Sequence, residues 1–263
     1  MQDYNNIDQK VHLLSQIIAK VNRNFVPKSP DDSHTNLFFD RIGHRLYGRW
    51  IDVKDEKIIL ALNIKEFTFE WLDHTRQVIQ SFGILGQKMS DLEETVERTL
   101  PDLGLKKGGF RDKLHFEIPA YPFLNEPFES IKLKSLENWE YYRNMANVAC
   151  SALLGYLQVD GEIRIWPHHF DTGIYVEPNT KTGLGFGLAM DDGLVGSPYY
   201  YFSGHRLDGE KFDYVNVPHL VTGKWIINEN WKGAVLPLSD FKKDNSRIIP
   251  TFLREVAQWF LVN

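Results

Sequence analysis

The sequence has few of the features that mark specialised proteins. Its 263 residues include one cysteine, Cys150, which excludes an internal disulfide and a metal site built only from cysteines. Apolar runs are short, as in 58–62, and cannot span a bilayer. The first residues contain neither a basic nor an apolar segment, so no secretory leader is recognisable. We therefore expect a soluble, cytoplasmic protein without a membrane partner.

A strong charge of one sign is also absent. Thirty Lys and Arg residues stand against 35 Asp and Glu residues, which gives a formal net charge of −5. The basic residues are scattered along the chain and form no stripe. A mildly acidic surface repels phosphate backbones, so we predict that nucleic acid is not a partner.

What is present is an ordinary globular composition, with 43% hydrophobic, 13% aromatic and 25% charged residues. The length allows one large domain or two of moderate size. Because no repeat, low-complexity tract or Gly/Ser linker interrupts the chain, we expect residues 1–263 to form a single unit. The alternative is two lobes, 1–135 and 136–263, that meet on a central helix. Both a monomer and a homodimer are compatible with the sequence.

Apolar residues recur at spacings of three and four in several segments, which is typical of helices with one buried face. The strongest of these segments is a long central helix that includes Cys150 among small residues. A thiol in such a setting packs in the core and does not act as a nucleophile. Ser90 and Glu93 fit a capping box, and a softer helical pattern covers 73–82. The expected helices are 6–25, 90–100, 136–158 and 247–261.

Short aromatic or β-branched segments, separated by turn residues, predict strands before and after the central helix. Because strands and helices do not alternate regularly, we expect an α+β fold instead of a doubly wound nucleotide fold. In this fold, largely antiparallel sheet packs against the long central helix, with further helices at both termini. The expected strands are 37–39, 46–53, 57–64, 66–71, 113–118, 162–170, 172–176, 183–190, 199–202, 212–217 and 232–238.

The segment 166–171, Trp-Pro-His-His-Phe-Asp, is the densest chemical cluster in the chain. On a strand, His169 and Asp171 would project to the same face. Together with His205 or His219 they would hold a divalent metal ion, which is the cofactor that this cluster suggests. Alternatively, His169 would act as a general base and Asp171 as its orienting partner. The alternative is a hydrogen-bonded pair in a partly buried sheet. We favour the pair, because a spacing of two residues arises often by chance.

Aromatic residues give the second half of the chain a distinct character. Trp166, Tyr199 and Tyr201 are expected to line a small-molecule pocket near 166–171, since aromatic pockets bind sugars and rings. The alternative function is a non-catalytic interaction or scaffold protein that uses an aromatic sheet face. A metal-dependent enzyme is a third possibility, with His169, Asp171 and His205 as candidate catalytic residues.

Glycines alternate with apolar residues over 183–187, inside a strand pattern. A phosphate-binding loop requires its glycines between a strand and a helix, so the pattern instead indicates a smooth sheet face that allows close approach. We predict that Gly185, Gly187 and Ala189 face a close-packed neighbour.

Four short motifs lie at 11–20, at 166–171, at Pro198-Tyr199 and at Leu236-Pro237. Together they resemble a family of uncharacterised bacterial proteins catalogued only as a domain of unknown function. Many members carry small residues where His168 and His169 stand, and an acidic residue where Ser197 stands. The resemblance therefore implies a shared role for Asp171 and not for the histidines, and it implies no activity.

Overall fold

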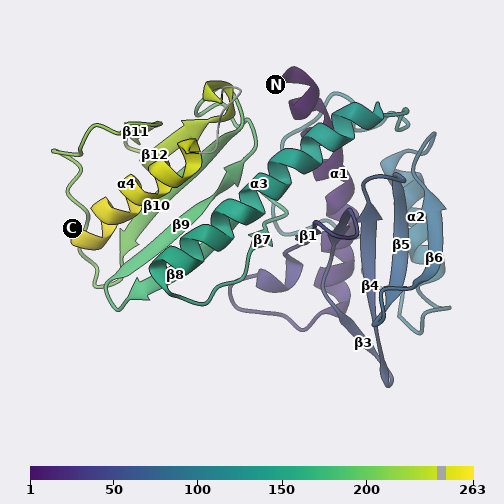
Figure 1. Ribbon diagram of the computed structural model, residues 1–263. Helices are drawn as coiled ribbons and strands as arrows, with labels where there is room; N and C mark the ends of the chain where they lie inside the picture. The colour runs from purple at the N-terminus through teal and green to yellow at the C-terminus, as the bar shows by residue number, and fades with distance from the viewer. Residues whose placement is uncertain (242–246) are drawn as a thin grey trace. The chain divides into compact units, whose positions relative to one another are not determined.

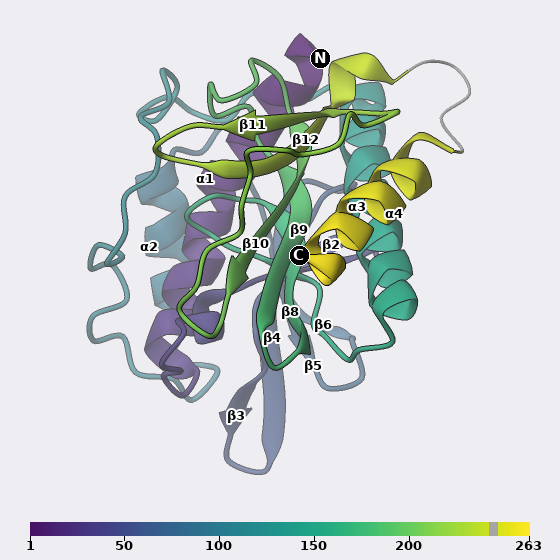
Figure 2. The same ribbon diagram turned by 90° about the vertical axis from the view of Figure 1, so that its left-hand side faces the viewer.

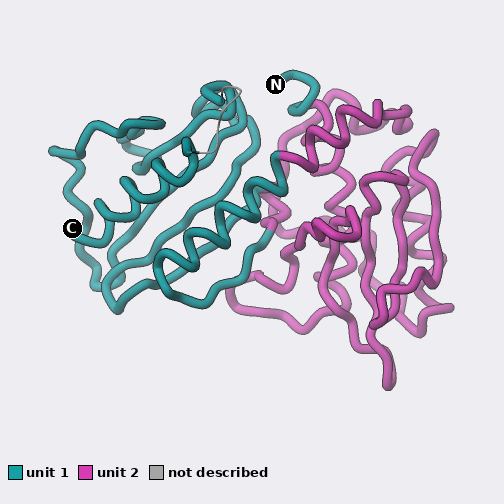
Figure 3. Tube along the Cα trace, viewed as in Figure 1, with its two compact units in different colours: residues 1–5, 142–164, 171–263 teal, residues 6–141, 165–170 magenta. Residues whose placement is uncertain are grey.

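The computed structural model describes residues 1–241 and 247–263. By its internal contacts the chain divides into two compact units (Figure 3). Unit 1 consists of residues 1–5, 142–164 and 171–263, and unit 2 consists of residues 6–141 and 165–170. The predicted α+β class is confirmed, since the chain forms two six-stranded antiparallel sheets together with helices.

All four predicted helices are present, with limits close to those expected. Helix α2 differs in its cap: the backbone N–H of Lys88 donates to Asp91 Oδ2 at 3.1 Å, so Ser90 and Glu93 do not form the capping box. Among the described residues, no helix combines the length and hydropathy of a membrane span. The helices are α1 (Gln2–Phe25), α2 (Met89–Thr99), α3 (Leu133–Leu157) and α4 (Ile248–Val262).

The sheet of unit 2 has the order β1-β2-β4-β5-β6, with β3 paired to β4. Its central strands β4 and β5 are buried along most of their length. Trp71 donates from its indole N–H to Thr99 Oγ1 of α2 at 2.9 Å, so α2 covers the face on which Trp71 lies. The strands are β1 (Phe38–Asp40), β2 (Arg45–Tyr47), β3 (Ile51–Val53), β4 (Glu56–Asn63), β5 (Thr68–Asp73) and β6 (Val78–Gly83).

The sheet of unit 1 has the order β11-β12-β10-β9-β8-β7. Small side chains of α3, among them Ala146 and Ala149, pack with α4 on the apolar face of this sheet. Figures 1 and 2 show α3 and α4 on the same side of β8, β9 and β10. The strands are β7 (Arg164–Ile165), β8 (Thr172–Asn179), β9 (Thr182–Ala189), β10 (Tyr199–Arg206), β11 (Lys224–Ile227) and β12 (Lys232–Pro237).

The expected strand over 162–170 is wrong, because only Arg164–Ile165 pairs as a strand. Pro167 has no N–H to donate to a ladder, and the chain turns at this point. The N–H of Phe170 donates to the carbonyl of Trp166 at 2.6 Å, and Phe170 has a φ of 53°. His169 and Asp171 therefore do not share a strand face.

Three further sequence expectations are wrong. Residues 73–82 form no helix, because Asp73 Oδ1 accepts hydrogen bonds from the N–H groups of Thr75 and Gln77 and closes a turn into β6. Residues 113–118 and 212–217 belong to no strand. Alternation of apolar residues was the only signal in those two segments, and neither segment is part of the two sheets that the described residues form.

Candidate functional site

Asp171 is hydrogen-bonded to a tyrosine of the unit 1 sheet. The hydroxyl of Tyr201 donates to Asp171 Oδ2 at 2.5 Å. Tyr201, Gly187 and Gly173 are paired positions on β10, β9 and β8. A Cβ atom at either glycine would lie 2.9 Å from the Tyr201 hydroxyl. The glycines thus leave room for the phenol, and Gly187 faces a close-packed neighbour as predicted.

Burial and the Asp171 carboxylate determine the protonation of the groups around this pair. Burial, followed by the charge and hydrogen bond of Asp171, raises the pKa of Tyr201 well above its ordinary value. Burial also raises the pKa of Cys150, and Asp171 adds to this effect. Tyr199, whose hydroxyl donates to Asp192 Oδ2 at 2.8 Å, has a raised pKa because of burial and that bond. The raised pKa values keep these groups protonated, so they do not act as bases or nucleophiles, and the two tyrosines serve as hydrogen-bond donors.

The remaining residues of the 166–171 cluster belong to unit 2. The ring centroids of His168 and His169 are 4.3 Å apart. Burial, followed by the nearby His169 and His115, lowers the pKa of His168 to about 4. Within the two described ranges, no group of three His, Cys, Asp or Glu side chains is arranged to hold a metal ion.

His205 lies on the same sheet face as Tyr201 but four residues along β10, which corresponds to roughly 13 Å. Its imidazole stacks on Tyr175 of β8, with ring centroids 5.5 Å apart. The hydroxyl of Tyr175 lies 3.2 Å from His205 Nε2 and donates to Glu177 Oε1 at 3.0 Å. His205 and Asp171 therefore belong to two separate polar groups of unit 1.

A cleft opens beside His205 because two neighbouring strands diverge. β10 pairs with β9 over its full length, from Tyr199 to Arg206, but with β12 only as far as Phe202. The second half of β10 thus has a strand on one side and a cleft of about 430 Å³ on the other. Six of the side chains that line this cleft are Ser203, His205, Lys211, Tyr214, Trp231 and Lys232.

The lining of this cleft is aromatic and basic. The ammonium group of Lys232 lies 5.7 Å from the centroid of the Tyr214 ring. Arg206 also lines the cleft, but its guanidinium pairs with Asp208 at 2.6 Å. Neither Lys211 nor Lys232 forms an ion pair with any residue that the structure describes.

His219, the other histidine considered as a metal ligand, lies in a second cleft of unit 1. This cleft has a volume of about 550 Å³ and is lined by His219, Trp259 and the end of α4. Its carboxylate, Glu255, already accepts a hydrogen bond from the N–H of Val221 at 3.0 Å. Among the described residues that line the second cleft, none is a lysine or an arginine.

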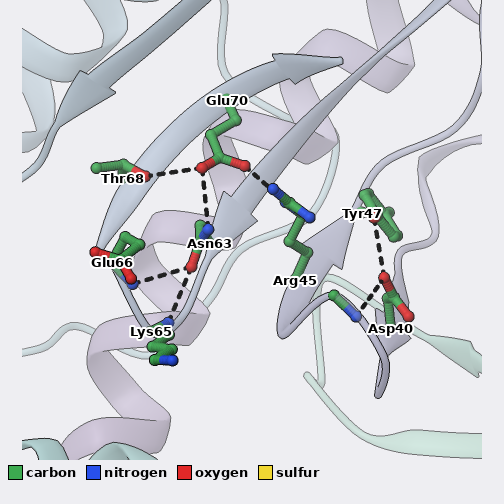
Figure 4. Close-up of polar contacts among 9 residues, drawn as sticks. Asp40, Arg45, Tyr47, Asn63, Lys65, Glu66, Thr68 and Glu70 are labelled. Carbon is green, nitrogen blue, oxygen red and sulfur yellow. Dashed lines mark hydrogen bonds and ion pairs between the residues drawn. The ribbon is translucent and has the colours of Figure 1, made fainter. Parts of the chain in front are cut away.

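A third polar cluster lies on the sheet of unit 2 (Figure 4). The buried carboxylate of Glu70 accepts hydrogen bonds from Arg45 Nε at 2.6 Å and Asn63 Nδ2 at 3.0 Å. Asn63 Oδ1 accepts from the N–H groups of Lys65 and Glu66 in the turn between β4 and β5. Both carboxylate oxygens of Glu70 and the amide oxygen of Asn63 have their donors within the cluster, so it stabilises the sheet.

Sequence reasoning missed both the Glu70 cluster and the cleft beside His205. The spacing of Asn63 before two turn residues is a local signal for the first of these. The cleft has no local signal, because it depends on where β12 separates from β10. Comparison with protein-family models, curated proteins and solved structures finds no match.

Proposed function

We propose that unit 1 binds a small anionic molecule that contains a flat ring, in the cleft beside His205. The observation behind this proposal is that two unpaired lysines and two aromatic rings line one cleft at the point where β10 and β12 separate. Its volume of about 430 Å³ lies within the range of roughly 300–1,000 Å³ that small-molecule sites occupy.

The requirement for a ring follows from Trp231 and Tyr214. Both are only half-buried, and aromatic side chains stack on flat ligands in offset or edge geometry. Trp231 is held in its turn, because its backbone N–H donates to Asn228 Oδ1 at 2.8 Å. A fixed ring binds at a lower entropic cost than a flexible side chain does.

The requirement for negative charge follows from Lys211 and Lys232. The protein as a whole has a net charge of −5, yet this cleft has two unpaired ammonium groups against the one carboxylate of Glu210. An anion beside them gains favourable Coulomb energy and hydrogen bonds. A neutral ring compound gains only the stacking.

This proposal keeps the small-molecule function expected from the sequence, but it puts the binding site in the cleft beside His205 and not near 166–171. His205 lines the cleft, whereas Trp166, Tyr199 and Tyr201 are not among its lining residues. Asp171 accepts a hydrogen bond from Tyr201, a different partner from the His169 with which the sequence analysis paired it. Membership of the uncharacterised bacterial family remains our inference from the four motifs and assigns no activity.

A panel of ring carboxylates and their neutral amides, observed by ligand NMR, tests the proposal. Indole-3-carboxylate is expected to bind with a dissociation constant of about 1 mM, a typical value for a ligand of this size, and indole-3-carboxamide more weakly. Trp231→Ala and Lys232→Gln should weaken the binding, while Lys57→Gln on the sheet of unit 2 should not. If no carboxylate of the panel binds, or if Trp231→Ala leaves binding unchanged, the proposal is wrong.

A further inference from the structure

The orientation of His205 is set by a chain of two hydrogen bonds. Glu177, Tyr175 and His205 form it, and Tyr175 is the middle member. The rings of Tyr175 and His205 are close to parallel, at 9°. Both lie over Gly183, where a Cβ atom would approach the Tyr175 hydroxyl and the His205 ring too closely. This glycine therefore allows the two rings to meet.

The hydrogens available to Glu177, Tyr175 and His205 determine the tautomer of His205. An ionised carboxylate only accepts hydrogen bonds, so the single hydroxyl proton of Tyr175 is donated to Glu177 Oε1. The Tyr175 oxygen must then accept at 3.2 Å from His205 Nε2, which requires a hydrogen on Nε2. In the neutral imidazole the other nitrogen, Nδ1, is left as the acceptor.

His205 lies between Tyr175 and the cleft. Tyr175 comes from β8, on one side of His205, and the cleft lies on the side of β10 from which β12 has separated. His205 lines the cleft, but Tyr175 and Glu177 do not. No hydrogen bond joins Nδ1 to another residue in the part of the chain that the structure describes. A ligand in the cleft thus meets an imidazole whose one unused polar atom is an acceptor.

We propose that His205 Nδ1 accepts a hydrogen bond from the ligand, so that the site selects anionic ring compounds that carry an N–H or O–H group. This inference rests on the proposed function and narrows its ligand class. The ammonium groups of Lys211 and Lys232 bind the anionic end, and His205 recognises the donor on the ring. His205 is a specificity-determining residue in this arrangement, and Tyr175 and Glu177 are its positioning residues.

The tautomer is tested first, without any ligand. In protein labelled with ¹⁵N-histidine at alkaline pH, where histidine side chains are neutral, the ¹⁵N spectrum distinguishes a nitrogen with hydrogen from one without. We expect His205 to carry its hydrogen on Nε2, and Tyr175→Phe to change this into a mixture of tautomers. The exposed His219 provides the reference signal. A hydrogen on Nδ1 of His205 in the unmodified protein would overturn the inference.

Ligand selection is tested with a matched pair of probes, indole-3-carboxylate and 1-methylindole-3-carboxylate. The two share a ring and a charge, but only the first has an N–H group. We expect the first to bind about three- to tenfold more tightly, the effect of one hydrogen bond. In His205→Phe this ratio should fall to about one, while Lys232→Gln should weaken both probes alike.

The outcomes separate the inference from the function on which it rests. If neither probe binds the unmodified protein, the proposed function fails. If both probes bind and the ratio persists in His205→Phe, the methyl group acts by size alone, and only the role of His205 is refuted.

Discussion

The polar cluster around Glu70 in unit 2 and the group around His205 in unit 1 both lie on an antiparallel sheet, yet they differ in how completely their members are satisfied. Glu70 accepts from Arg45 and Asn63, and Asn63 in turn accepts from the backbone. In unit 1, Tyr175 and Glu177 satisfy one side of His205, and the other side borders a cleft. A satisfied polar cluster stabilises a fold, whereas an acceptor left beside a cleft is suited to a ligand.

The comparison predicts that the largest loss of stability comes from unit 2. Glu70→Ala leaves the partly buried Arg45 and the buried Asn63 without their acceptor, and should lower the free energy of unfolding by about 3 kcal/mol. Urea unfolding measures this loss. Glu66→Ala, an exposed glutamate in the adjacent turn, is the control and should change stability little. Equal losses in both variants would show that the cluster contributes nothing of its own.

Close packing on the sheet of unit 1 predicts the next effect. In Gly187→Val the new Cβ atom would lie 2.6 Å from the Thr172 carbonyl oxygen, and backbone atoms cannot move aside as a side chain can. We expect a loss of about 2–3 kcal/mol from overpacking. At Gly185 the nearest atom is the Ser203 hydroxyl at 3.3 Å, so Gly185→Val should cost less. A melting temperature of Gly187→Val equal to that of the unmodified protein contradicts this packing.

The hydrogen bond between Asp171 and Tyr201 predicts a smaller loss of stability. The Asp171→Ala variant also tests whether Asp171 has a structural role or binds a metal ion. Asp171→Ala deprives the Tyr201 hydroxyl of its acceptor and should cost about 1–3 kcal/mol, in the presence or absence of a chelator. Tyr201→Phe in the same background should add little, because the two side chains interact with each other. One metal ion per chain in elemental analysis, lost in Asp171→Ala, would show that Asp171 is a metal ligand instead.

The lowered pKa of His168 predicts that stability depends weakly on pH. Its pKa is lowered to about 4 in the folded protein, against about 6.5 in an unfolded chain. Between these values the unfolded state binds more protons, so stability is full above pH 6.5 and decreases as pH falls towards 4. The loss should be about 1 kcal/mol, because the ring is partly exposed and solvent screens it. His168→Gln should flatten this part of the pH profile, and an unchanged slope would refute the assignment.

Periodicity predicted the four helices correctly because apolar residues recur at spacings of three and four in each one, and that pattern is local. The strand expected over 162–170 failed at Pro167, where a turn ends the ladder and Phe170 adopts a positive φ. Tyr201 and Asp171 were both expected as site residues, but their hydrogen bond spans 30 positions of sequence and depends on the register of β8, β9 and β10. Register is a property of paired strands, so no single segment encodes it.

The cleft was the hardest feature to predict. Lys211, Tyr214 and Trp231 come from a loop and from the turn between β11 and β12, and none of them belongs to a recognisable motif. They meet only because β12 leaves β10 after Phe202. His205 was expected as a remote partner of His169, and the structure places it instead beside Tyr175.

Chemical-shift mapping of ¹⁵N-labelled protein during a titration with indole-3-carboxylate tests the central claim most directly. The account predicts saturable shifts at Ser203, His205, Trp231 and Lys232, and unchanged signals at Arg45, Asn63 and Glu70. Shifts confined to other surfaces, or no saturable shift at all, would contradict the claim that the cleft beside His205 is the binding site.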